Sequence, residues 1–154
     1  MKYLIKRSSI GALAERLRRR KKRIVFTNGV FDILHRGHVE YLARARSFGD
    51  VLIVGLNSDE STRRLKGTGR PLQKQKDRAL ILLALEAVDY VVIFGEDTPE
   101  RLIDQIRPDV LVKGADYRLP DIAGADFVKS HGGSVRRVRL TRGRSTSRII
   151  QRLS

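Results

Sequence analysis

Short apolar runs rich in β-branched residues alternate with helical patterns along most of this 154-residue chain. The runs lack the polar alternation of a half-exposed strand, which indicates strands that are buried on both faces. Buried strands that alternate with helices are typical of a parallel sheet covered by helices on both sides. We therefore predict an α/β fold, a Rossmann-like doubly wound parallel sheet of about five strands. The predicted strands are residues 24–27, 51–56, 90–94, 110–112 and 134–140.

Helical patterns fill the segments between these runs. Residues 8–22 begin with two serines, which are suitable helix caps, and place Ile10, Leu13, Ala14 and Leu17 on one apolar face. A chain of this length suits one domain. We expect residues 1–22 to form an N-terminal helical extension and residues 23–154 to form the Rossmann-like core. Further helices are predicted over residues 37–48, 77–88, 98–106, 119–130 and 145–153.

Composition excludes several kinds of protein. The chain has no cysteine, which rules out disulfides and thiolate metal sites. Its longest apolar run, residues 79–88, is too short to span a bilayer. The first residues also lack the apolar segment of a signal peptide. We expect a cytoplasmic protein with no membrane partner.

The charge of the chain indicates an anionic partner. Its formal charge is +15, from 32 Lys and Arg residues against 17 Asp and Glu residues. Both a nucleic-acid backbone and small phosphorylated substrates would suit this charge. Aromatic residues make up only 6% of the chain, and no run interleaves them with basic residues as in surfaces that stack bases. We expect no nucleic acid in the main role, and keep a basic nucleic-acid-binding module as the non-enzyme alternative.

The motif His35-x-Gly37-His38 directly follows the first predicted strand and opens the next helix. The amides and dipole of a helix start stabilise an anion. Two neutral imidazoles can each donate a hydrogen bond to the same phosphate, and Gly37 lets a ligand approach the backbone closely. A zinc site is disfavoured, because His131 is the only other histidine. The motif therefore indicates chemistry at a nucleotide phosphorus.

A ligand of a doubly wound sheet lies outside the carboxyl ends of the strands, at the point where the strand order reverses. We expect the turns after Thr27, Leu56, Val112 and Leu140 to line one cleft there. The basic segment that follows residues 57–59 would pass over this cleft and carries Arg63, Lys66 and Arg70. Residues 145–147, Ser-Thr-Ser, place hydroxyls and amides at the start of the last helix, which makes a second anion site.

Three segments together resemble one enzyme family. Residues 28–32 (Asn-Gly-Val-Phe-Asp) followed by the two-histidine motif are similar to the signature of the cytidylyltransferase-like nucleotidyltransferases. Residues 113–117 (Lys-Gly-Ala-Asp-Tyr) resemble the nucleotide-contacting turn of that family, and residues 143–147 (Gly-Arg-Ser-Thr-Ser) resemble the signature that opens its last helix. The resemblance covers residues 23–153, in family order.

The resemblance implies roles for individual residues. His35, His38 and Lys66 would be catalytic, and Arg63, Arg70 and Arg78 are candidates for binding a substrate phosphate. Asp32 would orient a histidine or magnesium, or else bond to local turn amides; both alternatives stay open. Metal ligands are left unassigned. The nucleotide-binding residues implied are Thr27, Asn28, Gly29, Phe31, Asp32, Gly37, Lys113, Asp116, Ser145, Thr146 and Ser147.

Other segments resemble those of one enzyme of this family, the adenylyltransferase that acts on D-glycero-β-D-manno-heptose 1-phosphate. They are residues 57–62, 65–67, 70–71, 84–89, 96–99 and 121–124. This resemblance implies ATP with Mg²⁺, a sugar 1-phosphate partner, ADP-heptose for lipopolysaccharide or another cell-surface glycan, and a homodimer. In many relatives this activity is the second half of a bifunctional protein that begins with a sugar kinase. No kinase-sized region precedes Arg23, so we expect a separate kinase.

Two enzyme-like alternatives remain. One is a cytidylyltransferase acting on glycerol 3-phosphate or a related phospho-alcohol, since the shared motifs do not decide the base. Leu140-Thr141 stands where glycerol-phosphate cytidylyltransferases carry Arg-Thr, which disfavours this alternative. The other is a catalytically silent nucleotide sensor, against which the intact histidines and Lys66 argue.

Overall fold

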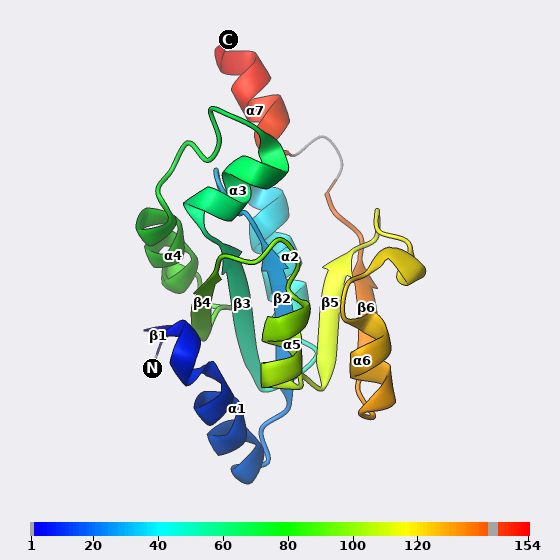
Figure 1. The fold of residues 1–154 in the computed structure, drawn as a ribbon. Coiled ribbons are helices and arrows are strands. Elements are labelled where there is room, and N and C mark those ends of the chain that lie inside the picture. Colours follow the sequence, from blue (N-terminus) through cyan, green and yellow to red (C-terminus); the bar gives the residue numbers. More distant parts are fainter. Residues whose placement is uncertain (1, 142–144) are drawn as a thin grey trace.

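Six parallel strands form one sheet in the computed structural model of the chain, which describes residues 2–141 and 145–154 (Figure 1). The order of strands across the sheet is β1-β4-β3-β2-β5-β6. The predicted α/β class is confirmed, with six strands in place of about five. Their bounds are β1 (Tyr3–Ile5), β2 (Ile24–Gly29), β3 (Val51–Asn57), β4 (Tyr90–Phe94), β5 (Val110–Gly114) and β6 (Ser134–Val138).

Helices cover both faces of the sheet. Consecutive strand residues point to opposite sides, so apolar strands present side chains on both faces that helices must bury. Ile24 and Phe26 pack with α1 (Ile10–Arg19), α5 (Glu100–Ile106) and α6 (Ala125–Ser130) in one buried cluster. Val25 packs in a second cluster with α2 (Arg36–Arg46) and α4 (Gln75–Ala84). The first set of helices lies in front of the sheet in Figure 1, and α2 lies behind it.

The first residues of the chain belong to the sheet and its covering layer. Tyr3, Leu4 and Ile5 pair in parallel with Tyr90, Val91 and Val92 of β4. After the short 3-10 helix η1 (Arg7–Ser9), the apolar face predicted for α1 packs against the strands. The expected N-terminal helical extension therefore needs correction: it contains an edge strand, and its helix is part of the core. Three residues are too few to show a strand pattern in the sequence.

Other elements differ from the prediction at their ends. The charged segment over the cleft forms a helix, α3 (Asp59–Lys66). The 3-10 helix η2 (Leu119–Asp121) precedes a shorter α6 than predicted, and β6 ends at Val138. The last helix is α7 (Thr146–Leu153). Across the two described ranges, no helix is both long and apolar enough to cross a membrane.

The order of strands reverses beside β2. From β2 the chain proceeds through β3 to β4 on one side, and then returns to place β5 on the other side of β2. Since the connections that leave β2 and reach β5 run in opposite directions across the sheet, a crevice opens at their carboxyl ends. Helices α3 and α7 stand above this edge of the sheet (Figure 1).

Candidate active site

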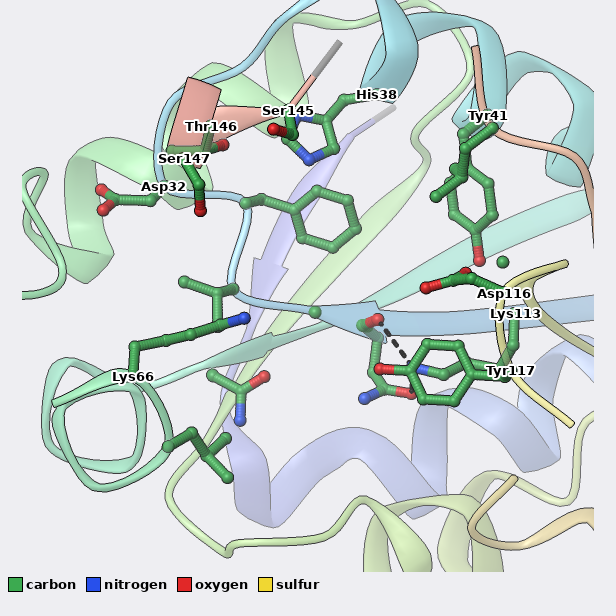
Figure 2. A pocket seen from close by; sticks show the side chains of 18 of the residues that line it. Asp32, His38, Tyr41, Lys66, Lys113, Asp116, Tyr117, Ser145, Thr146 and Ser147 are labelled. Atoms are coloured by element: carbon green, nitrogen blue, oxygen red, sulfur yellow. Dashed lines mark hydrogen bonds between the residues drawn. The ribbon is translucent and has the colours of Figure 1, made fainter. Parts of the chain in front are cut away.

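A cavity of about 600 Å³ lies at the carboxyl edge of the sheet, where the strand order reverses. Figure 2 shows Lys66 entering it from one side, Lys113 and Tyr117 from the opposite side, and His38 with the start of α7 from a third. Residues far apart in sequence are thus brought together. The residues predicted for the site that line this cavity are Asn28, Gly29, Phe31, Asp32, His35, Gly37, His38, Lys66, Arg70, Lys113, Asp116, Ser145, Thr146 and Ser147.

His35 caps α2. Its Nδ1 accepts a hydrogen bond from the backbone N–H of Gly37 at 3.0 Å. In the neutral ring the proton is therefore on Nε2, so Nε2 is the nitrogen that can donate. The ring stacks on that of His38, with centroids 3.9 Å apart. One side chain thus starts the helix and also brings a donor to its positive end.

His38 lies between His35 and Phe31, whose ring centroid is 5.3 Å from its own. Its Nδ1 is buried and has no hydrogen-bond partner in the part of the chain that the structure describes. Burial, with a smaller effect from the neighbouring His35, lowers the pKa of His38 to about 4. The imidazole is therefore neutral at pH 7 and can act as a hydrogen-bond donor without carrying a charge.

The Asp32 carboxylate is bonded to a neighbouring loop. It accepts hydrogen bonds from the backbone N–H groups of Leu72 and Gln73 and from Nε of Arg70, at 2.8–2.9 Å for the shortest contact of each donor. Burial raises the pKa of Asp32, but these three hydrogen bonds outweigh it and the pKa lies below its usual value. Of the two roles left open for Asp32, amide bonding is the one that the contacts match, although the amides lie 40 and 41 positions away in the sequence. Arg70, a candidate phosphate ligand, lines the cavity with its Nε committed to Asp32.

Lys66 is the last residue of α3. The helix begins at the cap Ser58, whose side chain accepts a hydrogen bond from the N–H of Ser61. Arg64 fixes the other end by contacts with Glu60, Asp97 and the backbone of Gly95. The ammonium group of Lys66 points toward the interior of the cavity (Figure 2). A cation held on a helix can contact a phosphate at a defined position.

Lys113 links the two strands between which the sheet reverses. Its Nζ on β5 donates to the backbone oxygen and to Oδ1 of Asn28 on β2, both at 3.4 Å, and lies 4.7 Å from the ring centroid of Tyr117. Burial lowers the pKa of Lys113 to about 8, although the Asp116 carboxylate opposes this effect. A β-carbon at Gly114 would lie 2.4 Å from Oδ1 of Asp116, so a side chain here would displace that carboxylate from its present position.

The start of α7 forms another wall. Ser145 caps the helix by accepting from the N–H of Arg148, and Thr146 Oγ1 donates to the backbone oxygen of Ile33. The second contact ties this helix start to the loop before α2, so both helices present their positive ends to one cavity. Gly143 and Arg144, which belong to the same predicted motif, lie outside the described residues.

Three predicted site residues do not line the cavity. Thr27 is fully buried, and its hydroxyl bonds to Tyr41 and to the backbone oxygen of Val112. Arg63 is exposed on α3 and is not among the residues that line the cavity. Arg78 is almost fully buried and donates to the backbone oxygens of Gln73, Val30 and Asn57 and to the Asp59 carboxylate. These contacts make Arg78 a structural link beneath the site and correct its expected role as a phosphate ligand.

Further residues, to which the sequence alone assigns no role at the site, also line the cavity, and several lie after the end of β4. The carboxyl edge rule, by which a ligand lies outside the carboxyl ends of the strands, selects the four turns named in the sequence analysis and applies equally to the turn after β4. Tyr41 reaches the cavity from α2, and Tyr117 belongs to a motif in which it has no predicted role. The additional lining residues include Tyr41, Asn57, Leu65, Asp97, Thr98, Pro99, Tyr117, Asp121, Ala123 and Leu140.

The cavity is rich in groups that bind phosphate, whereas the carboxylates and imidazoles that the structure describes there are not gathered into a metal site. Among residues 2–141 and 145–154, no group of three or more His, Cys, Asp or Glu side chains could hold a metal ion. The site instead offers lysines, imidazoles and two helix starts, which are the groups that bind phosphate oxygens.

Comparisons with known proteins agree with this geometry. The sequence profile of the family described as Cytidylyltransferase-like matches residues 26–152. "Bifunctional protein HldE" of Syntrophotalea carbinolica is 56% identical over 147 residues, which cover 96% of this chain and 30% of the relative. The protein of the same name from Geobacter sulfurreducens is 59% identical over 132 residues, or 86% of this chain and 27% of the relative. The chain thus spans less than a third of the length of these relatives.

Solved structures share the fold. The lipopolysaccharide core biosynthesis protein of Thermoplasma volcanium superposes with a TM-score of 0.64 at 27% identity, covering 78% of this chain and 97% of that protein. The pantoate–beta-alanine ligase of Francisella tularensis superposes with a TM-score of 0.62 at 15% identity, over 94% of this chain and 69% of that one. The second likeness concerns the fold alone.

Proposed function

The chain belongs to the cytidylyltransferase-like family, and from that premise we propose that it is a nucleotidyltransferase that joins ATP to D-glycero-β-D-manno-heptose 1-phosphate. The products are ADP-heptose and pyrophosphate. The observation that carries the proposal is the convergence of two imidazoles, two lysines and two helix starts on one cavity. Such a set of donors suits a reaction at a phosphorus atom that carries negative charge throughout.

In the proposed reaction a phosphate oxygen of the sugar attacks the α-phosphorus of ATP in line with the leaving pyrophosphate. The new bond joins that oxygen to the α-phosphorus, and the bond between the α-phosphorus and the bridging oxygen of the β-phosphate breaks. No covalent intermediate with the protein is needed, because the sugar phosphate is itself the nucleophile. The described residues form no metal cluster of their own, so Mg²⁺ would be carried by the ATP phosphates and would supply positive charge to the leaving pyrophosphate.

His35 and His38 hydrogen-bond the α-phosphate as charge grows on its equatorial oxygens. Lys66 and Lys113 approach the phosphates from opposite sides, and the starts of α2 and α7 supply backbone donors. Each well-placed donor contributes about 3–4 kcal/mol to the transition state, by analogy with oxyanion donors. The protein therefore acts by positioning and charge stabilisation, with no group required to accept a proton from the sugar phosphate.

The choice of sugar and pathway rests on likeness. Sequence segments that resemble the heptose adenylyltransferase contribute several residues to the cavity, and the Thermoplasma volcanium neighbour is a lipopolysaccharide core biosynthesis protein. We place the reaction in the cytoplasm, where ATP is available, as a step toward a cell-surface glycan. We also expect a homodimer, as the family resemblance implies; light scattering of the purified chain measures its mass in solution.

A pyrophosphate-release assay tests the proposal. ATP and CTP are each supplied with heptose 1-phosphate or glycerol 3-phosphate, and turnover is expected for ATP with the heptose. His38→Ala should lower that turnover by a factor of about 10²–10³, the loss of one such donor. Arg63→Ala is the matched control, because this cation lies outside the cavity. Preference for CTP and glycerol 3-phosphate would identify a cytidylyltransferase instead. Salt-sensitive binding of nucleic acid with no turnover of any pair would identify a nucleic-acid-binding module.

A further inference from the structure

The two ends of the cavity differ in chemistry. On the side of β5 and β6 lie the Tyr117 ring and Leu140, together with Lys113, whose ammonium is 4.7 Å from the centroid of that ring, and Asp116. An aromatic face and an apolar side chain suit a flat base, which stacks on such groups. On the side of β3 and β4 lie Asn57, Asp97 and Thr98, which offer an amide, a carboxylate and a hydroxyl. These three groups form hydrogen bonds with hydroxyl-rich ligands.

The two ends are well separated. Strands β4 and β5 flank β3 and β2 in the sheet, so three strand spacings, about 14 Å, lie between them. The histidine motif follows β2, between the two ends. A phosphorus held over β2 therefore has room for a base toward β5 and for a second ligand toward β4.

Asp97 is held at the β4 end by one of its oxygens. Its Oδ1 accepts a hydrogen bond from Nε of Arg64 at 2.8 Å, and Arg64 also contacts Glu60 and the backbone of Gly95. No donor among the described residues bonds to Oδ2 of Asp97. The carboxylate is therefore oriented by α3 and keeps a free acceptor, and its side chain is 66% exposed.

Asp97 is one of four aspartates that line the cavity, and it is the one in the turn after β4, where its carboxylate repels phosphate. Its free oxygen suits a neutral hydroxyl, whose O–H donates to a charged acceptor in a short and strong hydrogen bond. Thr98 follows Asp97 directly and adds a hydroxyl that both donates and accepts. The β4 end is thus suited to the polyol part of a ligand and unsuited to its phosphate.

We propose that Asp97, oriented by Arg64 and assisted by Thr98, binds hydroxyl groups of the sugar acceptor and determines its specificity. The inference rests on the proposed function. It assigns the nucleotide to the β5 end and the sugar to the β4 end. Arg64 acts through Asp97 and is a positioning residue.

Steady-state kinetics of Asp97 variants test this assignment. Asp97→Ala should raise KM for heptose 1-phosphate about tenfold or more, which is the expected loss of a hydrogen bond to a charged group, and leave KM for ATP within about twofold. Asp97→Asn keeps an oxygen for Arg64 but replaces the free acceptor by an amide donor, so it should raise the sugar KM as well. Glu60→Gln is the matched control: it removes another partner of Arg64 outside the cavity and should change neither KM.

Monodeoxy analogues of the sugar phosphate separate direct binding from a structural role. Wild-type protein should discriminate against at least one analogue by about tenfold, and Asp97→Ala should not distinguish that analogue from the parent sugar. An unchanged sugar KM in both variants, the same discrimination in Asp97→Ala as in the wild type, or an equal rise in KM for ATP would overturn the inference alone. No turnover of heptose 1-phosphate by the wild type would overturn the proposed function and this inference with it.

Discussion

The imidazole rings of His35 and His38 stack with their centroids 3.9 Å apart at the start of α2. Burial lowers the pKa of His38 to about 4, and the neighbouring ring adds to this effect because a second proton so close to it is disfavoured. The position and the neutral state of His38 suit a hydrogen-bond donor that binds a phosphate without forming an ion pair with it. The cationic part of the site comes from the lysines.

The free energy of unfolding should fall as the pH is lowered from 6.5 to 4. Over this range the unfolded chain binds a proton at His38 that the folded chain does not, so stability is complete above the unfolded pKa and is lost as the pH approaches 4. A pKa that changes from 6.5 to about 4 corresponds to about 3 kcal/mol at most. Urea unfolding at pH 7, 5.5 and 4.5 measures the free energy of unfolding, and His38→Gln should make that free energy depend less on pH. Equal pH slopes in the wild type and the variant would contradict the prediction.

His35 has two separable roles, and two substitutions should distinguish them. His35→Ala removes both the cap of α2 and a phosphate donor, so it should lower stability by about 1 kcal/mol and turnover by a factor of about 10²–10³. His35→Asn restores a good cap without restoring an imidazole donor at the same position. Thermal unfolding should then recover while turnover stays low. Recovery of turnover in His35→Asn would show that capping alone is what the reaction needs.

Much of the architecture could be predicted from local patterns. The apolar runs of β2 to β6 are long enough to be recognised, and the cap Ser145 acts within three residues, on the N–H of Arg148. Two elements were not predictable in this way. Strand β1 has only three residues, and α3 buries Ser61 and Thr62 with no apolar stripe, so its sequence resembles a solvated loop.

The site was predictable where function follows from a motif and unpredictable where it depends on distant partners. The histidine pair, Lys66 and the residues 145–147 reach one cavity, as the order of strands and helices implies. The hydrogen-bond partners of Asp32 and Arg78 lie up to 48 positions away in the sequence. The sequence alone therefore does not show that this carboxylate and this guanidinium have structural roles, and it suggests functional roles for both. Asp97 differs from these, since it follows β4 and the carboxyl edge rule alone is enough to select its turn.

Lys113 should give ATP binding an alkaline limit. Its pKa of about 8 means that the ammonium, which attracts phosphate, loses its charge as the pH rises through that value in the free protein. We expect kcat/KM for ATP to fall above about pH 8, and Lys113→Arg to move the fall upward because a guanidinium stays charged. Initial rates at limiting ATP, measured from neutral to alkaline pH, give this profile. A Lys113→Arg profile that coincides with the wild type would assign the limit to another group.

Asp32 should control the order of the loop that contains Arg70. Its carboxylate holds the N–H groups of Leu72 and Gln73, and Asp32→Asn removes the charge on which these contacts depend. We expect a loss of about 2–3 kcal/mol in stability, typical of hydrogen bonds to a charged group. Amide exchange at Leu72 and Gln73 should become faster than in the wild type, while exchange in β2 changes little. Unchanged protection of both amides would contradict this role.

Arg78 should contribute to the stability of the fold and not to substrate binding. Its guanidinium is buried and bonded to three backbone oxygens and to Asp59, and removing it leaves those acceptors without donors. Arg78→Met, which keeps most of the volume, should lower the free energy of unfolding by about 3–5 kcal/mol. Arg63→Ala, on the exposed side of α3, should change it by less than about 0.5 kcal/mol. Urea unfolding compares the two. If Arg78→Met instead kept its stability and raised KM for the sugar phosphate, the guanidinium would be a ligand of the substrate, as the sequence alone suggests.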